Sequence, residues 1–273
     1  MTIATVMVYV DPAQQTEEQV RVARELASRF KASMIGVSAI LLPPPIVSEG
    51  VMIEAVTEEE VTRMKAALAA KEDWFRTVVG LPKEKIEWRW GLSSPTAFLT
   101  TQARAADLVV MKSGYESADP SHFVDSAEAV LRMGRPVILV PDHVKELKAD
   151  RIVVGWKDTR EARIAVLQAL PLLTGASEVT IIELCLSNEQ DNARRHVDDV
   201  ARYLSLRGAN CRTDVRVQTA ESDSAHLLRL ASGAGADLIV TGAYGHSRLG
   251  EWLFGGMTRG LLKDASCCLM MSH

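Results

Sequence analysis

The sequence predicts an α/β protein built from two tandem doubly wound domains, each a mostly parallel five-stranded sheet with helices on both faces. Two observations support this fold class. Apolar strand-like segments alternate along the chain with amphipathic helical segments, which is typical of parallel sheets covered on both faces. The second half of the chain also repeats the first, which indicates a duplicated domain.

The repeat is defined by two ungapped matches. ADLVVMKSGY at 106–115 matches ADLIVTGAYG at 236–245, and the same offset of 130 aligns PVILVPDH at 136–143 with SCCLMMSH at 266–273. Two matches that share one offset are unlikely to arise by chance. The starts of the two copies differ by about 146 residues instead, so the first copy carries an insertion of about 16 residues, for which the proline-rich segment 41–56 is the candidate.

Each expected strand or helix follows from a local sequence pattern. Thr57 and Glu60, for example, have the spacing of a capping box at the start of a helix. In the first half we expect strands at 5–10, 33–40, 86–90, 107–111 and 137–140, and helices at 16–30, from 57 onward, at 96–105 and at 126–133. In the second half we expect strands at 152–156, 179–185, 211–218, 237–241 and 267–271, and helices at 160–173, 192–206, 224–232 and 254–264. The predicted domains are therefore 1–143 and 151–273, joined by a charged linker at 144–150.

The composition is that of a globular protein that can bury a core, with 47% hydrophobic and 24% charged residues. A formal charge of -4 supplies no concentrated positive surface, so nucleic acid is not an expected partner. The first apolar run lacks a preceding basic region and reaches Asp11 at once, which indicates a buried strand and no signal peptide. No segment approaches the roughly 20 apolar residues of a membrane helix. We expect free cysteine thiols, no membrane contact and a cytoplasmic location.

A glycine-rich loop follows the fourth strand of the second half and precedes its last helix. In parallel sheets ligands bind beyond the carboxyl ends of strands, and helix N-termini attract anions. Glycines let the backbone approach a ribose or a phosphate closely, although they also occur in surface turns that bind nothing. The loop is neither a Walker A sequence nor a GxGxxG fingerprint. Its glycines are Gly242, Gly245, Gly250, Gly255 and Gly256.

The spacing of glycine, two residues, glycine, nine residues and glycine resembles the signature of ATP-binding universal stress proteins. Gly242, Gly245 and Gly255 fit this spacing, and the resemblance extends over the whole chain as two domains. It implies a stress-response or signalling protein that binds ATP, ADP or AMP in its C-terminal domain, with the first two glycines beside the ribose and the later part of the loop at the phosphates. The implied nucleotide site comprises Trp156, Lys157, Asp158, Thr241, Gly242, Gly245, Gly255, Gly256, Met257 and Thr258.

The loop departs from the family pattern at two places. Gly256 stands where a serine or threonine usually follows the third glycine, so one phosphate hydroxyl is missing. Lys157, followed by Asp158, stands where the family tends to have aspartate at the end of the first strand. The sequence leaves open which of these two side chains enters the site.

The first half lacks the glycine loop altogether. At the offset of 130, Asp125 replaces Gly255 and Glu128 replaces Thr258. Two carboxylates would repel phosphates, so we expect one nucleotide per chain and none in the N-terminal domain.

Three functions are consistent with these observations. The first is a nucleotide-binding signalling module that changes its affinity for an unknown protein partner, the second a slow nucleotide hydrolase or transferase that uses His246 or Asp158, and the third an interaction protein that has lost nucleotide binding. No catalytic constellation is visible, and Cys267 and Cys268 lack the usual spacing of metal ligands. Because related single-domain proteins usually dimerise, we expect the two halves to pack with approximate two-fold symmetry, and a homodimer remains open.

Overall fold

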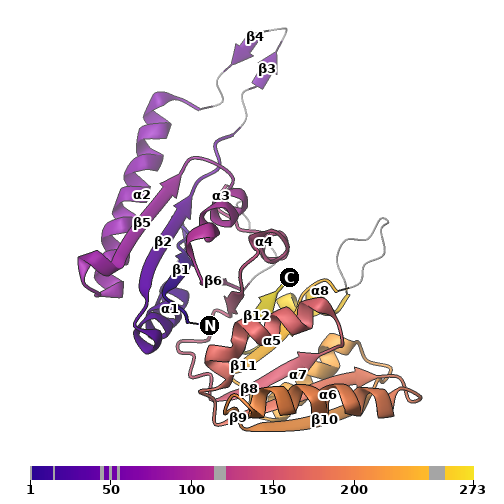
Figure 1. The fold of residues 1–273 in the computed structure, drawn as a ribbon. Coiled ribbons are helices and arrows are strands. Elements are labelled where there is room, and N and C mark those ends of the chain that lie inside the picture. The colour runs from indigo at the N-terminus through magenta and orange to yellow at the C-terminus, as the bar shows by residue number, and fades with distance from the viewer. Residues whose placement is uncertain are drawn as a thin grey trace.

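One ten-stranded sheet forms the centre of the molecule, and each half of the chain contributes five strands to it (Figure 1). Helices surround the sheet, so the predicted α/β fold class is confirmed. The computed structural model describes residues 2–14, 16–43, 46–48, 51–53, 56–113, 121–245 and 256–273.

The strands follow the order β10-β9-β8-β11-β12-β7-β6-β1-β2-β5. In each half the first strand is central, the second and third lie on one side of it, the fourth and fifth lie on the other, and all neighbours are parallel. The N-terminal strands are β1 (Thr5–Tyr9), β2 (Ser33–Ala39), β5 (Ile86–Gly91), β6 (Leu108–Lys112) and β7 (Val137–Val140). The C-terminal strands are β8 (Arg151–Trp156), β9 (Glu178–Cys185), β10 (Cys211–Val217), β11 (Leu238–Gly242) and β12 (Cys268–Ser272).

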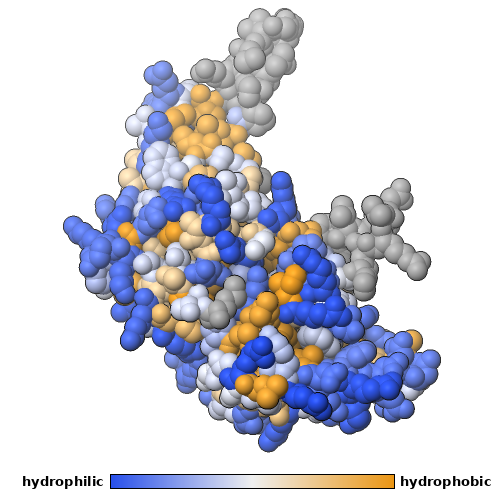
Figure 2. All heavy atoms as spheres, in the orientation of Figure 1, coloured by the Kyte–Doolittle hydropathy of each residue, from blue (hydrophilic) through white to orange (hydrophobic). Residues whose placement is uncertain are grey.

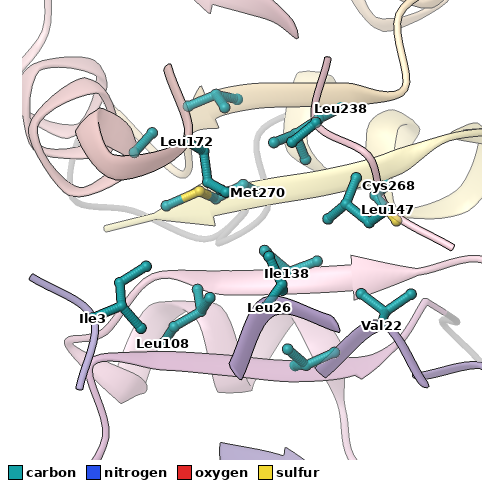
Figure 3. Close-up of a cluster of buried hydrophobic side chains, with 14 of the residues drawn as sticks. Ile3, Val22, Leu26, Leu108, Ile138, Leu147, Leu172, Leu238, Cys268 and Met270 are labelled. Atoms are coloured by element: carbon teal, nitrogen blue, oxygen red, sulfur yellow. The ribbon is translucent and has the colours of Figure 1, made fainter. Parts of the chain in front are cut away.

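The two halves join through their last strands. β7 and β12 are antiparallel neighbours, with Ile138 opposite Met270 and Leu139 opposite Leu269. Ile138 and Met270 are both buried and lie in one hydrophobic cluster (Figure 3). Pairing of equivalent strands in opposite directions is what an approximate two-fold relation between the halves produces. The expected packing of the two halves is therefore confirmed.

Two hydrophobic cores lie on the two faces of the sheet, and both extend through both halves. Alternation along β1 shows the division, because Val6 and Val8 belong to the first core while Met7 and Tyr9 belong to the second. The first core is covered by α1 (Glu17–Phe30), α2 (Glu58–Val79), α5 (Arg160–Leu173) and α6 (Gln190–Ser205). The second is covered by α3 (Pro95–Gln102), α4 (Ser126–Met133), α7 (Asp223–Gly233) and α8 (Gly256–Asp264). Two short 3-10 helices occupy Lys83–Lys85 and Ala103–Ala105.

The insertion at 41–56 contains regular structure that the sequence does not predict. β3 (Ile46–Ser48) and β4 (Val51–Ile53) pair antiparallel as a separate two-stranded sheet, which extends away from the main sheet in Figure 1. The helix that follows begins as predicted: the Thr57 hydroxyl accepts from the Glu60 N–H at 3.2 Å and the Glu60 carboxylate accepts from the Thr57 N–H at 2.8 Å. The capping box at Thr57 is thus confirmed.

The segment 144–150 is docked on the N-terminal half although its sequence lacks a strong hydrophobic pattern. Leu147 is buried in the first core. Its N–H donates to the Glu25 carboxylate at 3.2 Å, and the Arg29 guanidinium donates to the Lys148 carbonyl at 2.6 Å. Both partners lie on α1, so these bonds hold the segment that leads from β7 to β8.

The surface mixes polar and apolar residues. Figure 2 shows a largely hydrophilic surface around α6. Of the helices that the structure describes, none has the length and apolar character needed to span a bilayer.

The continuous sheet predicts that the chain unfolds as one unit. Ile138→Ala should lower the free energy of unfolding by about 2–5 kcal/mol, because it opens a cavity in a core that both halves share. Urea denaturation followed by circular dichroism and by tryptophan fluorescence should give one coincident transition. Leu206→Ala is the control, since Leu206 is 80% exposed and its loss should change stability by less than about 0.5 kcal/mol. Two separate transitions would contradict the prediction.

Candidate functional site

A cleft lies at the carboxyl end of the sheet in the C-terminal half. β8 and β11 are neighbours there, and the chain continues from them to opposite faces of the sheet, which makes this point the topological switch of the half. The described residues enclose about 180 Å³, which is below the usual range of pockets that hold a whole drug-sized ligand. Its lining residues are Gly155, Trp156, Lys157, Thr159, Ala162, Ile182, Leu184, Gln218, Asp223, Leu227, Thr241, Gly242, Tyr244, Gly245, Met257 and Thr258.

Three helices begin at this cleft. Thr159 caps α5 by accepting from the Ala162 N–H at 3.3 Å, and Ser222 caps α7 by accepting from the Ala225 N–H at 3.3 Å. The third helix, α8, starts at Gly256 and contributes Met257 and Thr258 to the lining. Because the chain itself caps α5 and α7 and Asp223 places a carboxylate in the lining, the first turn of α8 is the part of the cleft that favours an anion.

Gly242 is required by packing. A Cβ at this position would lie 2.5 Å from the Ala162 nitrogen and 2.6 Å from the Glu161 carbonyl carbon, both backbone atoms of α5. The absence of a side chain therefore lets β11 approach the first turn of α5 while the same residue lines the cleft.

Gly245 faces side chains of the same turn. A Cβ there would lie 2.8 Å from Glu161 Oε2 and 3.2 Å from Thr159 Oγ1. Gly256 differs from both, because no described atom lies within 4 Å of the position that its Cβ would take. None of the described residues therefore fills the space beside the first residue of α8.

Thr258 connects the last helix to the loop after β11. Its hydroxyl accepts from the Tyr244 N–H at 3.3 Å, and the side chain is buried. Tyr244 has a φ of 59°, a left-handed conformation that costs energy for a residue with a side chain. The Thr258 hydroxyl therefore helps to hold a strained turn at the wall of the cleft.

Two polar residues follow β8, and only one of them lines the cleft. Lys157 lines the cleft and one neighbouring cavity, whereas Asp158 lines neighbouring cavities alone and accepts from the Arg163 guanidinium at 2.5 Å. Trp156 lines the cleft with its indole largely buried. Thr241 donates its hydroxyl to the Gly155 carbonyl at 3.2 Å, which ties β11 to β8 at the floor of the cleft.

Most of the predicted site residues thus meet in one place. Trp156, Lys157, Thr241, Gly242, Gly245, Met257 and Thr258 line the cleft, while Gly256 and Asp158 are not among its lining residues. Gly255 and His246 lie outside the described residues.

The lining residues that the sequence analysis did not name come from other strand ends and helix starts. Gln218 follows β10, and its amide donates to the Asp223 carboxylate at the start of α7 at 2.9 Å. Ile182 and Leu184 lie on β9. Their place at the carboxyl ends of predicted strands could have indicated them, because these ends lie along one edge of a parallel sheet.

In the N-terminal half the chain itself caps the start of α4, the helix equivalent to α8. The Asp125 carboxylate accepts from the N–H groups of Ala127 and Glu128 at 2.9 and 3.0 Å, so it caps α4. Glu128 is paired with Arg132 on the surface. The expectation that both carboxylates repel phosphates needs correction, because Asp125 takes up the N–H groups that an anion would need.

The histidines that end the two halves contact backbone carbonyls. His143 contacts the Ser266 carbonyl at 2.8 Å and His273 contacts the Ala243 carbonyl at 3.0 Å, so both join neighbouring strand ends.

Burial raises the pKa of Cys267 to about 11 and of Cys268 to about 12, which keeps both thiols protonated at neutral pH. Within the described residues no group of three or more His, Cys, Asp or Glu side chains is arranged to hold a metal ion.

The fold and the cleft together define a tandem doubly wound α/β protein with a cleft at the switch point of its second half. Residues 176–273 match the model of the universal stress protein family. This match confirms, for residues 176–273, the resemblance that the glycine spacing indicates. No curated protein matches the chain significantly.

Two solved structures show the same fold over nearly the whole chain. A universal stress protein from Archaeoglobus fulgidus DSM 4304 has a TM-score of 0.74 at 12% identity, covering 98% of this chain and 95% of its own. A functionally unknown protein, PA1789 from Pseudomonas aeruginosa PAO1, has a TM-score of 0.62 at 12% identity, covering 99% and 92%. A universal stress protein from Archaeoglobus fulgidus in complex with dAMP covers 50% of this chain and 97% of its own at 19% identity, with a TM-score of 0.33.

The surroundings of Gly242 and Gly256 predict different effects of an alanine substitution on the free energy of unfolding. Gly242→Ala should lower the free energy of unfolding by about 1–3 kcal/mol without any ligand, because its Cβ would press on the α5 backbone. Gly256→Ala should leave stability unchanged or raise it by up to about 1 kcal/mol, since the space is open and alanine is the better helix former. Urea denaturation of the nucleotide-free variants measures both. Equal losses in the two variants would contradict this account.

Proposed function

We propose that this protein binds an adenine nucleotide, ATP or its di- or monophosphate, in the cleft of its C-terminal half. The observation that carries the proposal is the position of the cleft, at the topological switch between β8 and β11 and against the first turn of α8. The match of residues 176–273 to the universal stress protein family supports the choice of ligand.

The lining suggests how a nucleotide would lie. Ile182, Leu184 and Leu227 provide apolar surface for a base, while the end of β11 at Gly242 and Gly245 would approach the ribose. The phosphates would extend toward α8, whose first turn offers backbone N–H groups and open space beside Gly256. Lys157 is the cationic side chain among the described lining residues and would contact the phosphates.

The N-terminal half would remain without nucleotide. Asp125 satisfies the N–H groups of α4 from within the chain, so a phosphate would have to displace a carboxylate that makes two hydrogen bonds. One nucleotide per chain is therefore the expected stoichiometry.

Hydrolysis or transfer is the second hypothesis, and it needs a base beside the phosphates. Asp158 is engaged by Arg163 and is not a lining residue of the cleft, and His246 is outside the described residues. No observation among the described residues favours it. Incubation with ATP and timed detection of ADP tests it directly.

A role in signalling or in the stress response rests on the family relation. In this proposal nucleotide occupancy changes the affinity for a protein partner. Mass spectrometry of the small molecule released from the purified protein identifies the bound nucleotide.

Asymmetric occupancy is the first prediction from this proposal. Isothermal titration with ATP should give one equivalent per chain for the wild type, and Gly255→Asp should abolish binding, because it places in the second half the residue that closes the first. Asp125→Asn is the matched control: it keeps the cap on α4 and should leave the stoichiometry and the affinity unchanged. Two equivalents in the wild type, or unchanged affinity in Gly255→Asp, would refute the assignment.

Lys157 should discriminate between nucleotides by their charge. Lys157→Met should weaken ATP binding by about 1 kcal/mol, roughly fivefold, and AMP binding by less, because the exposed ammonium acts on a more highly charged phosphate chain. Titrations at two salt concentrations should show a weaker salt dependence in the variant. Arg160→Met is the control, since Arg160 is exposed and does not line the cleft. Equal effects of both substitutions would exclude a specific role for Lys157.

A further inference from the structure

A second cavity lies on the opposite side of β9 from the nucleotide cleft. It encloses about 380 Å³, within the range of pockets that hold small molecules. Its walls are the carboxyl end of β9, the turn that follows and the first turns of α6, and it shares Lys157, Leu184 and Gln218 with the cleft.

Glu183 is the central polar group of this cavity. Successive residues of a strand point to opposite faces, and Ile182 lines the nucleotide cleft whereas Glu183 lines the second cavity. The Glu183 side chain is only 9% exposed. One carboxylate oxygen lies 3.2 Å from His196 Nδ1, while the other, Oε2, is buried with no hydrogen-bond partner among the described residues. A buried carboxylate oxygen without a donor is costly, and a ligand that supplies one would remove this cost.

The neighbouring acids already have partners. Asp158 accepts from Arg163 at 2.5 Å, and Glu189 accepts from the Leu186 N–H at 3.2 Å. Of these three acids, Glu183 is the one with a buried carboxylate oxygen that has no hydrogen-bond partner among the described residues. The lining holds these three carboxylates and the ammonium of Lys157, and Arg163 offsets the charge of Asp158, so one negative charge is left and the cavity favours a cation.

The chemistry of the lining selects the kind of cation. The described residues contain no cluster of three metal-ligating side chains, so a metal ion would find too few ligands. Apolar surface from Leu186 and Ala193 lies beside the carboxylate and suits a hydrocarbon chain. Burial raises the pKa of the Glu183 carboxyl, which is the expected effect where charge on a carboxylate lacks full compensation.

We propose that this cavity binds a small alkylammonium compound, whose N–H group donates to Glu183 Oε2 while its carbon chain packs on Leu186 and Ala193. The site does not require the nucleotide proposal, because Glu183 and His196 are not among the lining residues of the cleft, although the two cavities share Lys157, Leu184 and Gln218.

The test is a titration of the full-length, isotope-labelled protein with n-butylamine at neutral pH, followed by amide chemical shifts. Saturable shifts should appear at the end of β9 and in the first turns of α6. Sodium butyrate and n-butanol have similar carbon chains without the ammonium, and neither should reproduce these shifts. Zinc chloride should not produce them either.

Glu183→Gln should weaken n-butylamine binding by about tenfold or more, because the charged acceptor is lost. Glu178→Gln is the matched control on the same strand, where Glu178 is paired with Arg151 and Arg212 outside the cavity, and it should bind like the wild type. Leu186→Arg is a second variant that leaves the core intact, since Leu186 is 52% exposed, and its guanidinium should compete for the site. Absence of saturable shifts, equal shifts from butyrate, or undiminished binding in Glu183→Gln would overturn the proposal.

Discussion

The parallel pairing of β8 with β11 is the constraint on which the candidate site depends. It places the ends of two strands, distant in sequence, side by side, and Thr241 ties them together through the Gly155 carbonyl. The helices that follow these strands must then leave on opposite faces, so their N-termini converge around the gap. Gly242 allows the close approach of β11 to α5 that this arrangement requires. The cleft is therefore a product of strand order, and its polar residues are set on a rigid frame.

The same frame is present in the N-terminal half, and the difference between the halves is local. β1 and β6 pair as β8 and β11 do, and α4 occupies the place of α8. One carboxylate, that of Asp125, satisfies the start of α4, whereas α8 begins with a glycine beside open space. A duplicated fold can thus keep its packing while one side chain decides whether a helix N-terminus faces a ligand or its own chain.

The sequence predicts most of the fold because its central strands are buried on both faces and appear as apolar runs, and because the repeat shows each element twice. It misses β3 and β4, whose three-residue strands lie in a proline-rich segment without alternation. The spacing of the glycines indicates the loop. From the sequence, Gly242 is assigned to ligand binding alone, whereas close packing against α5 also requires a glycine at this position. The sequence does not indicate Glu183. A single glutamate within an apolar strand carries no pattern, and only the structure shows that His196 contacts one of its carboxylate oxygens while the other has no partner among the described residues.

The junction between the halves has a consequence for how the chain folds. β7 and β12 are fully buried strands more than a hundred residues apart, and each is an unprotected edge until the other half has formed. Contacts of such long range form late, because closing a long loop costs entropy before the pairing stabilises it. During that interval either edge can pair with the matching edge of another chain, so exchange of halves between two molecules is the misfolding route that this architecture favours.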